Sequence, residues 1–280
     1  MKIGLFLFTT MDAVHMGTLA RVAEDAGIES IWVPEHTHMP VDHSKAPIGG
    51  GDPPRSYSRL LDPLMALTAA ASTTERLLLG TAVTLTAAHD PIILAKQIAT
   101  VDHLSNGRLI LGVGSGWNEP ELANHGVDFG TRWGRAREHL EAMKVIWTQE
   151  EASFTGKWVD FDRIWSWPKP AQKPYPKILF GTIKPSPLVI KYADGWLPLA
   201  IAHPGKLREK LGLLREMAEM AGRDPDTLDI TVMYLEQVTA EMLADFADAG
   251  ATRVVVRPPV DDLQQYETFI SRYARLLEPV

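Results

Sequence analysis

The chain of 280 residues contains no cysteine, and this absence excludes several kinds of site at once. Disulfide bridges, thiol nucleophiles and thiolate-bound metals all require that residue. No positively charged segment followed by an apolar stretch opens the chain, and no apolar run is long enough to cross a membrane. Basic residues are also in short supply, because 28 Lys and Arg face 35 Asp and Glu, which gives a formal charge of −7. We therefore expect a cytoplasmic protein that binds neither a membrane nor nucleic acid.

What is present suits a large globular core. Hydrophobic residues make up 45% of the chain and charged residues 22%, an ordinary balance for a folded domain. The length fits one α/β barrel of about 250 residues with insertions. No internal repeat, low-complexity tract or linker divides the sequence. We predict a single domain over residues 1–280.

Eight short apolar segments have the character of buried strands. They are residues 2–8, 29–33, 77–83, 108–113, 177–181, 195–199, 228–234 and 253–257. Segments with helical spacing lie between most of them, at 13–26, from Asp62, from Asp90, and at 135–148, 207–221, 240–249 and 260–277. Strands that alternate with helices eight times predict a (β/α)₈ TIM barrel of the α/β class. Residues 37–59 and 118–133 then form loop insertions at one end, and residues 150–176 form an ordered excursion without helical period.

Residues 77–117 contain the clearest local signals. Asp90 and Pro91 predict a helix start, with Asp90 as N-cap and Pro91 at the first helical position, and Asp62-Pro63 repeats that logic. A strand, a helix and a strand of this length require parallel strands joined by a right-handed crossover. Ligands of such sheets bind at the carboxyl ends of the strands, which here are Ala82-Val83-Thr84 and Gly114-Ser115-Gly116.

The same region carries a family resemblance. Its matching segments are Leu79-Gly80-Thr81-Ala82-Val83-Thr84, His89-Asp90-Pro91, Leu104-Ser105-Asn106-Gly107-Arg108 and Leu111-Gly112-Val113-Gly114-Ser115-Gly116-Trp117. In order and spacing the chain resembles the luciferase-like monooxygenase superfamily, in the branch of oxidoreductases that use coenzyme F420. The resemblance extends from Met1 to about Trp196.

The resemblance implies a set of cofactor-binding positions. They are Glu35, Ala82, Val83, Thr84, Gly114, Ser115, Gly116, Trp117, Gly181 and Thr182, with the last two near the cofactor phosphate. It also implies a cis peptide between Ala82 and Val83. Trp117 stands where the sugar-phosphate dehydrogenases of the family carry a glutamate that donates a proton. Three polar residues follow it closely, namely Asn118, Glu119 and Glu121.

His36 is the candidate catalytic residue. It follows the second predicted strand, on the face where barrel active sites form, and histidine is the residue type best suited to proton transfer near neutral pH. A histidine at this place can also serve only to bond a loop carbonyl, and His36 with His38 can form the His-x-His pair of metal hydrolases. The metal hypothesis lacks further ligands at the later strand ends, so we predict no metal. The resemblance favours a functional Glu35-His36 pair, with His36 beside the cofactor.

The resemblance implies that the protein is an enzyme and a homodimer. Its expected reaction is hydride transfer between deazaflavin and an unidentified small organic substrate. The alternatives are an FMN-dependent monooxygenase that uses reduced flavin and oxygen, a barrel that binds flavin without turnover, and a metal-dependent hydrolase. Among the tryptophans, Trp117 and Trp196 are expected to reach the site.

Overall fold

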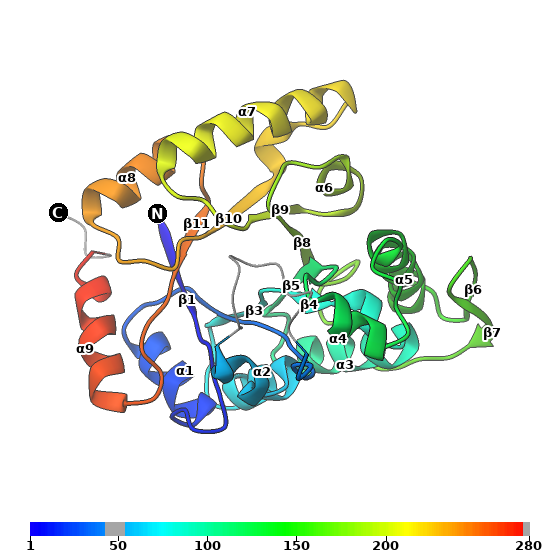
Figure 1. The fold of residues 1–280 in the computed structure, drawn as a ribbon, viewed down its shortest axis with the longest axis horizontal. Coiled ribbons are helices and arrows are strands. Elements are labelled where there is room, and N and C mark those ends of the chain that lie inside the picture. The colour runs from blue at the N-terminus through cyan, green and yellow to red at the C-terminus, as the bar shows by residue number, and fades with distance from the viewer. Residues whose placement is uncertain (43–53, 277–280) are drawn as a thin grey trace.

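The computed structural model describes residues 1–42 and 54–276, so part of the predicted loop at 37–59 lies outside the described residues. Within them, eight main strands form one parallel sheet that closes on itself (Figure 1). The strands are β1 Lys2–Phe6, β2 Ser30–Val33, β3 Leu78–Thr81, β5 Leu109–Gly114, β8 Lys177–Thr182, β9 Gly195–Pro198, β10 Asp229–Met233 and β11 Arg253–Val256. The pairing of β3 with β5 completes the ring. The predicted TIM barrel is confirmed.

Helices lie on the outside of the barrel (Figure 1). They are α1 Met16–Asp25, α2 Pro63–Ala71, α3 Pro91–Leu104, α5 Arg132–Thr148, α6 Pro187–Tyr192, α7 Pro204–Met220, α8 Ala240–Asp248 and α9 Leu263–Ala274. Both predicted helix starts are confirmed. The Asp62 carboxylate accepts a hydrogen bond from the amide of Met65, and the Asp90 carboxylate accepts from Ile92 and Ile93, all at 2.9 Å.

Three parts of the prediction were incomplete. The excursion at 150–176 contains an antiparallel hairpin of β6 Ala152–Thr155 and β7 Asp160–Ile164, which lies outside the barrel (Figure 1). Helix α6 and the short α4 Glu119–Asn124 were not predicted, because six residues are too few for a visible period. The predicted strand at 77–83 is interrupted, since β3 ends at Thr81 and a separate β4, Thr84–Leu85, pairs with β5.

The interior of the barrel is filled mainly by large apolar side chains, and Trp32 is the largest of them. The Trp32 ring is fully buried, and its Nε1 donates to Ser30 Oγ at 2.9 Å. Glycine is required at position 80 because a Cβ there would lie 2.3 Å from Cε3 of this ring. The close approach of the Trp32 ring on β2 to the backbone of β3 therefore requires glycine at position 80.

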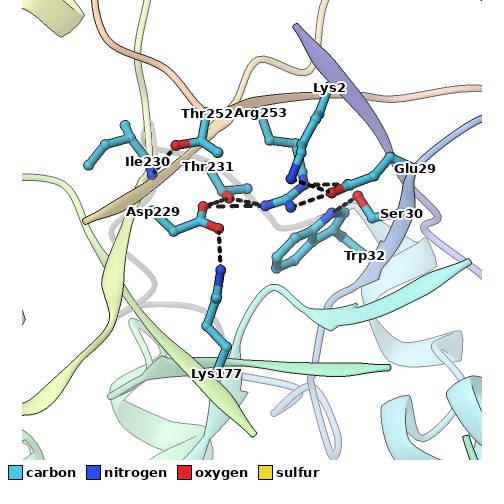
Figure 2. Close-up of polar contacts among 10 residues, drawn as sticks. All are labelled: Lys2, Glu29, Ser30, Trp32, Lys177, Asp229, Ile230, Thr231, Thr252 and Arg253. Carbon is cyan, nitrogen blue, oxygen red and sulfur yellow. Dashed lines mark hydrogen bonds and ion pairs between the residues drawn. The ribbon is translucent and has the colours of Figure 1, made fainter. Parts of the chain in front are cut away.

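A buried charge network closes the amino-terminal end of the barrel (Figure 2). Arg253 is 1% exposed and bonds Glu29 through Nε at 2.5 Å and Nη2 at 2.6 Å. Its Nη1 lies 3.3 Å from Asp229, which also accepts from Lys177 at 3.0 Å. Burial opposes ionisation of both carboxyl groups. Hydrogen bonding and charge from Arg253 outweigh burial at Glu29, and the charges of Arg253 and Lys177 outweigh it at Asp229, so the pKa of each carboxyl group is lowered. Active sites of barrel enzymes form at the opposite, carboxyl-terminal end of the strands.

Within the described part of the chain, no helix combines the length and apolar character needed to cross a membrane.

Candidate active site

His36 lies just beyond the end of β2, and its partner is a carboxylate from a different element. The Nδ1 atom of His36 is 2.7 Å from Oε2 of Glu121, and the two side chains are 6% and 1% exposed. Glu121 belongs to the short helix α4, where Asn118 is the N-cap and accepts from the amide of Glu121. This buried pair is the arrangement of a histidine base oriented by a carboxylate.

The pairing of His36 with Glu121 was not predicted, although the sequence carries a signal for it. Asn118 and Glu121 have the three-residue spacing of a helix N-cap and an acidic third helical residue. That pattern indicates a helix start in the loop after β5, at the carboxyl ends of the strands. The capping pattern could have predicted that the Glu121 carboxylate lies near the end of the strand that carries His36. Only the fold shows that this carboxylate contacts His36.

Glu35, the acidic residue of the Glu35-His36 motif, makes contacts separate from those of His36, and its predicted place at the cofactor stays a prediction. Glu35 accepts from the amide of Leu85 at 2.6 Å and lies 2.6 Å from Nε2 of His89. Burial opposes protonation of His89, but the bond to Glu35 outweighs it and raises the pKa of His89. Neighbouring residues of an extended chain point to opposite sides, so Glu35 and His36 cannot share one contact. Glu35 therefore supports the backbone of β4.

Aromatic rings form one wall beside His36. Its ring centroid is 5.1 Å from that of Tyr57 and 5.3 Å from that of Trp117, with the indole edge-on at 73°. Phe8 continues the wall, with its centroid 4.9 Å from Tyr57. At its far end the Arg257 guanidinium lies 4.8 Å from the centroid of Phe8. Trp117 therefore lies beside His36, and its predicted contact with the cofactor stays a prediction.

The peptide between Ala82 and Val83 is cis, which confirms that prediction. Both side chains remain partly exposed, whereas Thr84 and Ser115 are buried. Val83 packs against two neighbouring strand ends. A Cβ at Gly114 would lie 2.1 Å from its Cγ2, and one at Gly181 would lie 2.4 Å from its Cγ1. These two glycines make room for Val83, which is a reason for glycine that the sequence did not reveal.

The remaining predicted positions, Gly116, Thr182 and Trp196, all make contacts within the protein. Gly116 has φ +80° and packs near Leu122. The hydroxyl of Thr182 accepts from Nε1 of Trp196 and donates to the carbonyl of Lys184, both at 2.8 Å. Its proton is therefore already used within the protein. Trp196 is fully buried in the core between strands and helices, so its expected place in the site was wrong.

No cluster of three or more potential metal-ligating side chains occurs among the residues that the structure describes. His36 and His38, the predicted His-x-His pair, point to different partners. His38 bonds Thr37 and Asn124, while His36 bonds Glu121. The described residues therefore give the metal-hydrolase alternative no ligand set.

Comparison with known proteins identifies the family. The family model for luciferase-like monooxygenase matches residues 1–276. The chain is 40% identical to an uncharacterized protein of Mycobacterium tuberculosis over 99% of both chains. It is 32% identical to an F420-dependent glucose-6-phosphate dehydrogenase of Amycolatopsis mediterranei, over 75% of this chain and 61% of that one. The structure of the monooxygenase RslO1 from Streptomyces bottropensis superposes with a TM-score of 0.78 at 21% identity, covering 99% and 98% of the two chains, which shows a shared fold. This chain therefore belongs to the luciferase-like monooxygenase family, among F420-dependent relatives, and is an oxidoreductase.

Proposed function

We propose that this oxidoreductase transfers a hydride between coenzyme F420, a deazaflavin, and a small organic substrate. The observation that carries the proposal is the buried His36–Glu121 pair at the carboxyl ends of the strands. A relative with 32% identity over most of this chain is named as F420-dependent. Together these observations favour dehydrogenase chemistry over the binding of a flavin without turnover.

The mouth of the barrel suits a flat ring. Ala82, Val83 and Leu199 are partly exposed apolar side chains that pack on the barrel interior. An apolar floor with a few polar groups at its edge is typical of cofactor sites. When bound there, deazaflavin would accept or give a hydride at its C5 atom. Ala82 and Val83 would support the ring, and His36 would stand at its edge.

Glu121 prepares His36 for proton transfer. The ionised Glu121 carboxylate accepts a hydrogen bond from Nδ1–H of His36. The other ring nitrogen, Nε2, then carries no proton and is the basic atom. An alcohol that loses a hydride from carbon must also lose its hydroxyl proton, and Nε2 of His36 takes that proton. Trp117 lacks an acidic proton and cannot replace the glutamate of the sugar-phosphate enzymes. In this chain the carboxylate acts through His36.

The anionic part of the cofactor would meet a different set of groups. Because the proton of Thr182 is used by the Lys184 carbonyl, the backbone beyond Gly181 and the exposed lysines are the available partners. Lys184 and Lys191 lie on the segment that follows β8. Each exposed ion pair contributes only about 0–1 kcal/mol, so several weak contacts would share the task.

Equilibrium binding of deazaflavin and FMN in parallel tests the proposal. We expect deazaflavin to bind at least about tenfold more tightly, about 1.4 kcal/mol, and less tightly as salt rises. Lys184→Gln and Lys191→Gln should flatten the salt dependence. Lys206→Gln is the matched control, because the Lys206 ammonium is already paired with Glu209 at 2.7 Å.

The opposite binding result would replace the proposal. If FMN binds equally well or better, or co-purifies in stoichiometric amount, the function is that of a monooxygenase using reduced flavin and oxygen. The fold shared with RslO1 is compatible with that outcome.

A further inference from the structure

The second oxygen of Glu121 contacts Thr37 and not His36. Its Oε1 accepts a hydrogen bond from the amide of Thr37 at 3.0 Å and lies 3.5 Å from the Thr37 hydroxyl. Glu121 is buried, whereas Thr37 is exposed. A histidine that gains a proton in every turnover must also lose one, and a buried pair cannot release it directly to water. The Thr37 side of Glu121 is the outlet that the contacts provide.

The Thr37 hydroxyl is held between two further imidazoles. Oγ1 of Thr37 lies 2.6 Å from Nε2 of His125 and 2.9 Å from Nδ1 of His38. The rings of these two histidines are 5.4 Å apart. The hydroxyl of Thr37 therefore joins the buried carboxylate of Glu121 to a pair of half-buried histidines.

The donors and acceptors around Thr37 set the direction in which each hydrogen bond of this cluster is donated. The amide nitrogen of Asn124 donates to Nε2 of His38 at 2.8 Å, so the proton of neutral His38 is on Nδ1 and points to Thr37. Thr37 Oγ1 accepts that bond, and its own proton is then left for Nε2 of His125. Oγ1 lies 3.5 Å from Oε1 of Glu121, and its second lone pair can accept a hydrogen bond from Glu121 once that carboxyl group is protonated. Protonated Glu121 can thus donate to Thr37 while Thr37 donates to His125.

We propose that Thr37 and His125 form a proton relay between the His36–Glu121 pair and solvent, with His38 orienting the Thr37 hydroxyl. The substrate proton arrives on Nε2 of His36, and the Nδ1 proton of His36 passes to Oε2 of Glu121. Rotation of the Glu121 carboxyl brings this proton to Oγ1 of Thr37, whose own proton moves to Nε2 of His125 and then to water. One proton enters and one leaves, and no electrons are exchanged. A turn of the His36 ring then brings its remaining proton to Glu121 and frees the other ring nitrogen for the next turnover. The reverse sequence delivers a proton to His36.

The charges around His125 agree with its place at the end of the relay. Burial and the nearby imidazole of His38 lower the pKa of His125, while Glu121 and Glu35 raise it and His89 lowers it further. The net effect keeps His125 neutral at neutral pH, so that Nε2 is free to accept a proton. The role of His36 as a base belongs to the proposed function, and the relay rests on it.

Proton exchange in the cofactor-free protein tests the relay without any assay of turnover. We expect Thr37→Val to slow exchange between the His36 Nδ1 proton and water by about tenfold, measured by saturation-transfer NMR with ¹⁵N-labelled histidine. Thr37→Ser keeps the hydroxyl and is the matched control, with exchange close to the native rate. His125→Gln should also slow exchange, and added imidazole should restore it. Exchange at the native rate in both Thr37→Val and His125→Gln would overturn the relay.

This readout separates the relay from the cofactor assignment. If deazaflavin fails to bind while Thr37→Val still slows exchange at His36, the relay stands and the proposed cofactor is wrong. If deazaflavin binds and turnover occurs, Thr37→Val should lower kcat and enlarge the solvent deuterium effect, with cofactor affinity unchanged. An unchanged solvent effect together with native exchange would leave Thr37 a purely structural residue.

Discussion

Replacement of Arg253 by methionine should destabilise the barrel strongly, because the guanidinium is the common partner of two buried carboxylates. Glu29 and Asp229 are 21% and 5% exposed at their side chains, and removal of one partner of a buried ion pair typically costs about 3–5 kcal/mol. Lys2 remains 3.5 Å from Glu29, and Lys177 remains 3.0 Å from Asp229. Because these lysines still pair with the two carboxylates, we expect Arg253→Met to lower the free energy of unfolding at pH 7 by about 3 kcal/mol, the lower end of that range.

The pH dependence of this loss has a definite sign. In the native protein the lowered pKa values of Glu29 and Asp229 give stability that is fully present above their unfolded values, about pH 4–4.5. That stability is lost as pH falls through the lower folded values. Without Arg253, burial favours the neutral, protonated form of the two carboxyl groups. The variant therefore gains stability relative to the native protein as pH is lowered from 7 toward about 4.5, and the loss of unfolding free energy caused by Arg253→Met should shrink over that range.

Urea unfolding followed by circular dichroism at both pH values measures this effect. Arg163→Met is the matched control, because the ion pair of Arg163 with Glu151 is 70% and 40% exposed and should contribute about 0–1 kcal/mol. A loss below about 1 kcal/mol for Arg253→Met at pH 7, or a loss that does not change with pH, would refute the reasoning.

Three further changes test other parts of the structure. His36→Asn should lower turnover at least tenfold, about 1.4 kcal/mol in the barrier, with an unchanged circular dichroism spectrum; native steady-state rates would contradict its role. Gly80→Ala should cost about 1–3 kcal/mol in urea unfolding, because its Cβ would meet Trp32 at 2.3 Å. Gly212→Ala, in an open position of α7, is its control and should be neutral or stabilising. The raised pKa of His89 gives stability that is full below about pH 6.5 and declines as pH rises through the folded value, so His89→Gln should lose this dependence of the unfolding midpoint on pH.

Local signals determined the architecture. The alternation of buried strands and amphipathic helices predicted the barrel, and the pairs Asp62-Pro63 and Asp90-Pro91 predicted two helix starts that the structure confirms. Such signals work because they depend on residues within a few positions of each other. Short elements escaped the same reasoning. Helix α4 has six residues, too few for a periodic pattern to appear.

The pairing of side chains in the site depended on the fold. His36 and Glu121 are 85 positions apart, and Glu35 and His89 are 54 apart. The sequence placed His36 at a strand end and placed acidic residues near it, but it could not decide which carboxylate each histidine would meet. Side chains alternate in direction along an extended segment, so Glu35 turned toward β4 while His36 turned toward α4.

The sequence by itself determined the barrel and placed His36 at the carboxyl ends of its strands, the end at which barrel enzymes have their active sites. Tertiary structure alone decided that Glu121 is the partner of His36, that Thr37 faces the other oxygen of Glu121, and that Gly114 and Gly181 make room for Val83. The physical reason is the range of the interactions. Helix caps and burial patterns are set by neighbouring residues, whereas hydrogen bonds and close approaches across the barrel exist only when the parallel strands bring distant loops together.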